Sequence, residues 1–167
     1  MSLHLLNNTE IDSNHASKIN PQYKTEISGD NYISVCIKAI EKLIQLMQEA
    51  QEACDKLNSY KDAKIQGKIV TSALISDSYT SFTSLVTKIK EIIMAFIQDC
   101  SSALESIDTT EEESSLHDLK FLLEQLQMLL TGLRAFNLSK DIKYSKISLA
   151  ILENLLKIFK NCLENPQ

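Results

Sequence analysis

The sequence predicts an all-α protein, an up-and-down (antiparallel) four-helix bundle. Apolar residues repeat with a seven-residue period in four successive stretches, which places them on one face of each helix. Only three Gly and two Pro occur in 167 residues, too few for a turn-rich β fold. The connections between the stretches are short, so consecutive helices are expected to run antiparallel.

The domain organisation follows from where this period begins. Residues 1–30 are rich in Asn, Ser and Thr and carry no sustained apolar period, which predicts a flexible N-terminal tail. Residues 31–165 are expected to form a single helical-bundle domain. Its first helix should begin near Asp30 or Asn31 and end at residues 58–60, with one apolar register made of Ile33, Cys36, Ile40, Leu43, Met47, Ala50, Cys54 and Leu57.

The second helix is expected to be the long one, from Asp62 to about Ile107. Its apolar register is strict from Ile75 onward, but Ile65 and Ile69 follow a displaced stripe, and the change of phase falls at residues 76–78. A stutter within one helix or a real break would both explain this change. We expect a continuous but bent helix, part of which projects beyond its neighbours.

The third and fourth helices have clear boundaries. Thr110 and Glu113 have the spacing of a capping box and predict the start of the third helix, which should continue to about Phe136. Residues 137–138 are expected to form a turn, and residues 142–163 the last helix, which Pro166 follows. The third helix carries its main register on Leu116, Leu119, Leu123, Leu126, Leu130 and Leu133.

Charge and composition exclude several classes of function. The formal net charge of −5 disfavours nucleic acid as a partner, and the longest apolar runs are far too short for a transmembrane segment. The chain shows no basic start followed by an apolar run, so we expect a cytoplasmic protein or one exported by a leaderless route. The four cysteines are far apart and beside apolar residues, which favours reduced thiols over disulfides.

The motifs of enzymes and metal carriers are missing from the sequence. It contains no Glu-x-x-His pair of the kind that helical bundles use for metals and no glycine-rich phosphate loop. Glu113 and His117 are one turn apart but lack a second half-site. We therefore expect no catalytic residue, cofactor or metal. A metal-binding bundle enzyme is the remote alternative, and it would require a stoichiometric ion in the purified protein.

The leading functional hypothesis is a non-enzymatic protein that binds another protein, or a second copy of itself, through surplus apolar residues. These candidates flank the main registers and exceed what one two-helix seam needs. The alternative is that they fill the wider core of a four-helix bundle. The candidate partner-binding residues are Ile37, Ile44, Leu122, Leu129, Leu155 and Ile158.

A second hypothesis is a toxin-neutralising immunity protein that docks on a basic toxin. The acidic contact would then consist of Asp108, Glu111, Glu112 and Glu113. Binding through these carboxylates should weaken with added salt, whereas binding through apolar residues should not.

Part of the chain resembles a known superfamily. The segments 64–68, 72–73, 96–99 and 103–108 make residues 31–108 similar to the WXG and LXG helical-hairpin proteins of bacterial type VII secretion. This resemblance implies two long antiparallel helices that meet at a glycine-containing bend, here Gly67. It also implies a secretion-associated partner or chaperone that dimerises through its helical faces. The chain has no Trp, residues 31–108 contain no Leu-x-Gly, and no Tyr is followed four residues later by an acidic residue.

Overall fold

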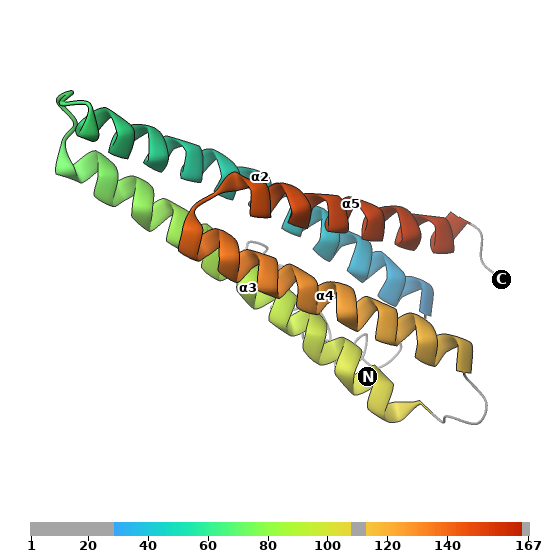
Figure 1. The fold of residues 1–167 in the computed structure, drawn as a ribbon. Coiled ribbons are helices and arrows are strands. Elements are labelled where there is room, and N and C mark those ends of the chain that lie inside the picture. Colours follow the sequence, from blue (N-terminus) through green and yellow to red (C-terminus); the bar gives the residue numbers. More distant parts are fainter. Residues whose placement is uncertain (1–28, 108–112, 165–167) are drawn as a thin grey trace, which may run out of the picture.

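The computed structural model describes residues 29–107 and 113–164, which form four helices. Helix α2 covers Gly29–Ile65, α3 covers Ser72–Ser106, α4 covers Glu113–Ser139 and α5 covers Ile142–Glu164. Consecutive helices run in opposite directions, and α5 returns to lie against α2 (Figure 1). Helix pairs α2·α3, α3·α4, α4·α5 and α2·α5 are all in contact, so the predicted antiparallel four-helix bundle is confirmed.

The expected long second helix is wrong, because the first turn of the chain comes later than the apolar pattern suggested. Helix α2 continues through residues 58–60 to Ile65, and α3 begins only at Ser72. Gly67 provides the turn with a φ of +78°, a backbone conformation that side chains with a Cβ rarely adopt. Thr71 then caps α3, since its hydroxyl accepts a hydrogen bond from the backbone N–H of Leu74 at 3.3 Å. Helix α3 is continuous through residues 76–78.

The connection between α4 and α5 also differs from its expected position. Helix α4 includes residues 137–138 and ends at Ser139, and the turn consists of Lys140 and Asp141. Lys140 has a φ of +53°, and its N–H donates to the carbonyl of Phe136 at 2.8 Å. Asp141 caps α5, because its carboxylate accepts from the backbone N–H of Lys143 at 3.0 Å.

This connection is anchored on the α2–α3 hairpin. The carbonyl oxygen of Lys140 accepts hydrogen bonds from the Asn58 side-chain amide at 2.9 Å and from the Cys54 thiol at 3.3 Å. The Lys140 ammonium group lies over the rings of Tyr79 and Phe82. Helix α4 therefore ends, and α5 begins, beside the middle of the α2–α3 hairpin. The far end of the hairpin extends beyond these two helices (Figure 1).

The core runs along the axis where all four helices are present. The predicted register of α2 is buried from Cys36 to Leu57, and that of α3 is buried from Phe82 to Ala103. Ile33 and Ile75 are only half-buried, and Tyr79 is exposed. In α4 the stripe is shifted by about one position, so that several leucines of the predicted main register are only half-buried. Helix α5 turns two serines inward, Ser145 and Ser148. The fully buried stripe of α4 consists of Leu122, Leu126, Leu129, Leu133 and Phe136.

Candidate functional site

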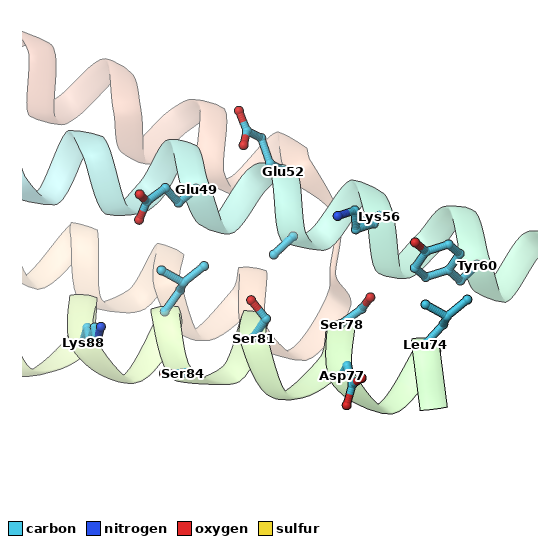
Figure 2. A pocket seen from close by; sticks show the side chains of 12 residues that line it. Glu49, Glu52, Lys56, Tyr60, Leu74, Asp77, Ser78, Ser81, Ser84 and Lys88 are labelled. Atoms are coloured by element: carbon cyan, nitrogen blue, oxygen red, sulfur yellow. The ribbon is translucent and has the colours of Figure 1, made fainter. Parts of the chain in front are cut away.

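A groove of about 700 Å³ lies along the outer face of the α2–α3 hairpin (Figure 2). Tyr60 and Leu74 face each other across one end of the groove. Small side chains, among them Ala53 and Ser81, leave the space between the two helices open. Its lining is made of Glu49, Glu52, Ala53, Lys56, Tyr60, Leu74, Asp77, Ser78, Ser81, Ser84, Leu85 and Lys88.

This groove has the chemistry of a recognition surface. Acidic and basic side chains alternate along it, with Glu49, Glu52 and Asp77 beside Lys56 and Lys88. The lining also carries three serine hydroxyls and contains no histidine and no cysteine. The groove can offer polar contacts to a peptide or helix.

The predicted partner-binding residues mostly belong to the core. Ile37, Leu122, Leu129 and Leu155 are buried, and Ile44 is half-buried against the same core. The structure therefore places these residues as the alternative hypothesis had it, inside a core that is wider than a two-helix seam. Ile158 differs from the other five, because 39% of its surface is exposed.

Exposed apolar residues do occur on α4 and α5, next to the predicted ones. Phe121 and Met128 are exposed, whereas Leu122 and Leu129, each one position later, are buried. On α5, Ile147 and Ile158 are exposed, as is Leu163 near the end of the helix. We call these four residues the α4–α5 strip: Phe121, Met128, Ile147 and Ile158, between 39% and 58% exposed. Sequence reasoning missed three of them, because adjacent apolar positions on a helix cannot be assigned to core or surface without the neighbouring helices.

The strip lies along one seam. Gly132 faces Ser148, since a Cβ on the glycine would meet the serine hydroxyl. Both helices rise about 1.5 Å per residue, so in the antiparallel pair Phe121, eleven positions before Gly132, lies level with Ile158. Met128, four positions before Gly132, lies level with the turn of α5 that follows Ile147. Spacings of seven and eleven residues keep each pair on one side of its helix.

A second exposed apolar group lies at the end of the α2–α3 hairpin. Ile69 is 100% exposed and Ile65 is 84% exposed. Leu74, near the start of α3, is also exposed. The sequence had placed Ile65 and Ile69 on a displaced helical stripe. The structure instead places Ile65 in the last turn of α2 and Ile69 in the connection to α3.

The predicted acidic contact falls largely outside the described residues. Asp108, Glu111 and Glu112 are not among them, and Glu113 is described only as the first residue of α4. His117 is exposed on α4. Within residues 29–107 and 113–164, no three His, Cys, Asp or Glu side chains gather in a way that could hold a metal ion.

The cysteines are all free, and three of them are buried. Burial raises the pKa of Cys36 to about 12 and that of Cys100 to about 11, and it raises the pKa of Cys54. Thiols with such pKa values are almost fully protonated at neutral pH and make poor nucleophiles. Cys162, which we also expected beside an apolar face, is exposed near the end of α5.

Polar groups gather around two of these thiols. Tyr32 and Cys36 of α2 interact electrostatically with Asp99 and Cys100 of α3, and burial raises the pKa of Tyr32 well above its ordinary value. The Asp99 side chain is fully buried. None of these four residues lines the α2–α3 groove, so a substrate bound there would not contact them.

In comparisons with known proteins, no family model, curated protein or solved structure matches the chain. Among the described helices, none is long and apolar enough to cross a membrane. The function therefore has to be argued from this chain's own residues.

Proposed function

We propose that the chain is a non-enzymatic helical bundle that binds another protein, and that the α4–α5 strip is its binding surface. The observation that supports this proposal is the position of the four apolar side chains. They follow one another along a single seam and remain exposed after the core is complete. Aromatic residues and Met are the residue types that protein interfaces favour.

The size and chemistry of the strip fit a partner helix. Phe121 and Met128 are two turns apart, and Ile147 and Ile158 are three turns apart, so the strip extends over about 16 Å of the seam. An amphipathic helix could lay its apolar face along this seam and bury all four side chains. Ile151, half-buried between the two α5 residues, would add to the contact.

The resemblance to type VII secretion proteins gives the proposal a narrower form. In that form the chain is a secretion-associated partner or chaperone, and the strip shields an apolar helix of the protein that it escorts. This form predicts a partner with a long amphipathic helix that aggregates when the chain is removed.

Site-specific photocrosslinking in the native cell tests the proposal. A photoreactive residue at Met128 or Ile147 should give a covalent adduct with the same partner. At Gln48, an exposed residue of α2, it should give none. Adding the substitution Phe121→Ser to the protein with the photoreactive residue at Ile147 should abolish its adduct. The helical circular dichroism should not change. Equal adducts at all three positions, or none at the strip, would contradict the proposal.

A further inference from the structure

The end of the α2–α3 hairpin is free of the other two helices. The α4–α5 connection packs against Asn58 and Tyr79, and none of residues 58–77 is buried. Seven residues of α2 extend beyond Asn58, so the hairpin projects by about 10 Å past this anchor. Figure 1 shows this end standing clear of α4 and α5. We call residues 61–74 the hairpin tip.

The hairpin tip exposes large apolar side chains at its outermost point. Ile69 is fully exposed, Ile65 nearly so, and Leu74 is exposed behind them. No core explains these side chains, because the four-helix region ends at the other side of Tyr60. An isoleucine at the apex of a projecting turn leaves nearly its whole apolar surface in water.

The charge of the hairpin tip is opposite to that of the chain. The sequence has a net charge of −5, but no Asp or Glu occurs between Asp62 and Asp77. Lys61, Lys64 and Lys68 lie within the tip, and the side chains of all three are exposed. Lysines beside exposed isoleucines form the pattern that proteins use at the surface of anionic membranes, where ammonium groups meet phosphates and apolar side chains enter the lipid.

We propose that the hairpin tip docks on an anionic lipid surface, with Ile65 and Ile69 inserted among the headgroups and Lys64 and Lys68 paired with lipid phosphates. This docking goes beyond the proposed protein binding, which uses the opposite helix pair. The convex shape of the tip favours a deformable lipid surface over a folded partner, which would have to supply a matching hollow.

The backbone of the tip sets the depth of insertion. Hydrogen bonds within the turn join the Gly67 N–H to the Lys64 carbonyl and the Lys68 N–H to the Ala63 carbonyl. Residues 68–71 have no regular structure, and those of their backbone groups that are not bonded within the turn require water or headgroups as partners. Insertion therefore stops at the headgroup level, with the helices of the bundle remaining in water.

Binding to vesicles tests the proposal on the full chain. The chain should float with vesicles of phosphatidylcholine mixed with phosphatidylglycerol and should bind phosphatidylcholine alone at least about tenfold more weakly. Added salt should reduce the binding. The double variants Ile65→Ser with Ile69→Ser, and Lys64→Glu with Lys68→Glu, should each lower the partition coefficient by about tenfold or more.

Matched controls separate the tip from general stickiness and from general charge. Met128→Ser with Ile147→Ser removes two exposed apolar groups from the α4–α5 strip, and Lys157→Glu with Lys160→Glu reverses two exposed lysines of α5. Both controls should keep at least half of the binding to anionic vesicles. All of these side chains are exposed, so the variants should keep the wild-type circular dichroism and melting temperature.

Tryptophan fluorescence reports which part of the chain enters the lipid. The sequence contains no Trp, so Ile69→Trp supplies a single emitter at the apex of the tip. Its emission should shift to the blue with anionic vesicles, whereas that of Met128→Trp should not. The proposal is overturned if wild type does not bind anionic vesicles, if the tip variants bind as wild type does, or if only Met128→Trp shifts. Salt-sensitive capture of an acidic protein by the tip, with vesicle binding absent, would also overturn it.

Discussion

Gly132 of α4 lies directly against Ser148 of α5, so close that a Cβ on the glycine would be 2.9 Å from the serine hydroxyl oxygen. Ser148 is almost completely buried. A glycine facing a serine lets the two helices approach closely, while the larger side chains on either side fill the core. The pair also places Phe121 level with Ile158, and so it determines the geometry of the α4–α5 strip.

The close contact predicts a non-additive double-mutant cycle. Gly132→Ala gains about 1 kcal/mol of helix propensity but forces the new methyl group onto the Ser148 hydroxyl, at a cost of about 1–3 kcal/mol. We expect a net loss of about 1 kcal/mol in the free energy of unfolding. Ser148→Ala removes the hydroxyl, so the double variant should recover the loss. Urea denaturation of all four proteins measures the coupling.

Additivity of the two substitutions within about 0.5 kcal/mol would show that the helices do not meet at this pair. Ala150, which is exposed on α5 near Ser148, supplies the control position. Ala150→Ser should show no coupling to Gly132→Ala.

Helix number and direction could be predicted from the sequence, because a seven-residue period reports which face of each helix is buried. The assignment of single leucines could not. Helix α4 packs against both α3 and α5, so its buried face is wide, and Leu122 and Leu129 fall inside it while Phe121 and Met128 fall outside. In α5 two inward serines interrupt the apolar pattern. Ser148 lies where α4 and α5 approach closely at Gly132, and Ser145 accepts a hydrogen bond from the Gln51 side chain of α2.

The position of the first turn also could not be predicted from the apolar pattern. Ile65 and Ile69 look like core residues in the sequence, but they are exposed. The useful signals were local: Gly67 permits a positive φ, and Thr71 can cap a helix that starts after it. Neither signal was enough to place the turn there, because the apolar stripe continues on both sides of Gly67.

The Asn58–Lys140 hydrogen bond should contribute measurably to stability. Asn58→Ala leaves the Lys140 carbonyl with only the weak thiol donor of Cys54, so the free energy of unfolding should fall by about 1 kcal/mol. Asn58→Asp should cost more at neutral pH, because a carboxylate would face the carbonyl oxygen. The exposed neighbour supplies the control: Ser59→Ala should change stability by less than about 0.5 kcal/mol. Thermal unfolding of the three variants measures these losses. Equal losses of stability in all three would show that the contact is unimportant.

Thiol reagents should distinguish the four cysteines in the native protein. Cys162 is exposed and should react with an aromatic disulfide reagent at pH 8 in a single fast phase of one equivalent. Cys36, Cys54 and Cys100 are buried, so their reaction requires opening of the bundle and should be at least about a hundredfold slower. Cys162→Ala should remove only the fast phase. Fast reaction of more than one equivalent would mean that the core is open in solution.

The buried thiols should make the protein sensitive to alkali. The pKa of Cys36 is raised from 9.0 to about 12 and that of Cys100 to about 11, so above pH 9 the unfolded chain loses protons that the folded protein keeps. This stabilisation is complete below pH 9 and is lost as the pH rises towards 11 and 12. Each thiol should add a slope of up to about 1.4 kcal/mol per pH unit. The Cys36→Ala variant should therefore show a shallower decline between pH 9 and 11, whereas Cys162→Ala should decline as wild type does.

Substituting Gly67 by Ala tests the hairpin turn. The substitution is the same as at Gly132, but its cost in stability has a different cause. An added Cβ would have no atom within 4 Å, so the cost of Gly67→Ala comes only from the positive φ, about 1–2 kcal/mol. Gly67→Asn should cost less, because Asn tolerates this conformation better than Ala. Neither loss can be rescued by Ser148→Ala, which separates backbone strain from side-chain overlap. An unchanged unfolding free energy in Gly67→Ala would mean that the turn does not hold Gly67 at positive φ in solution, and the α2–α3 connection would then have to be redrawn.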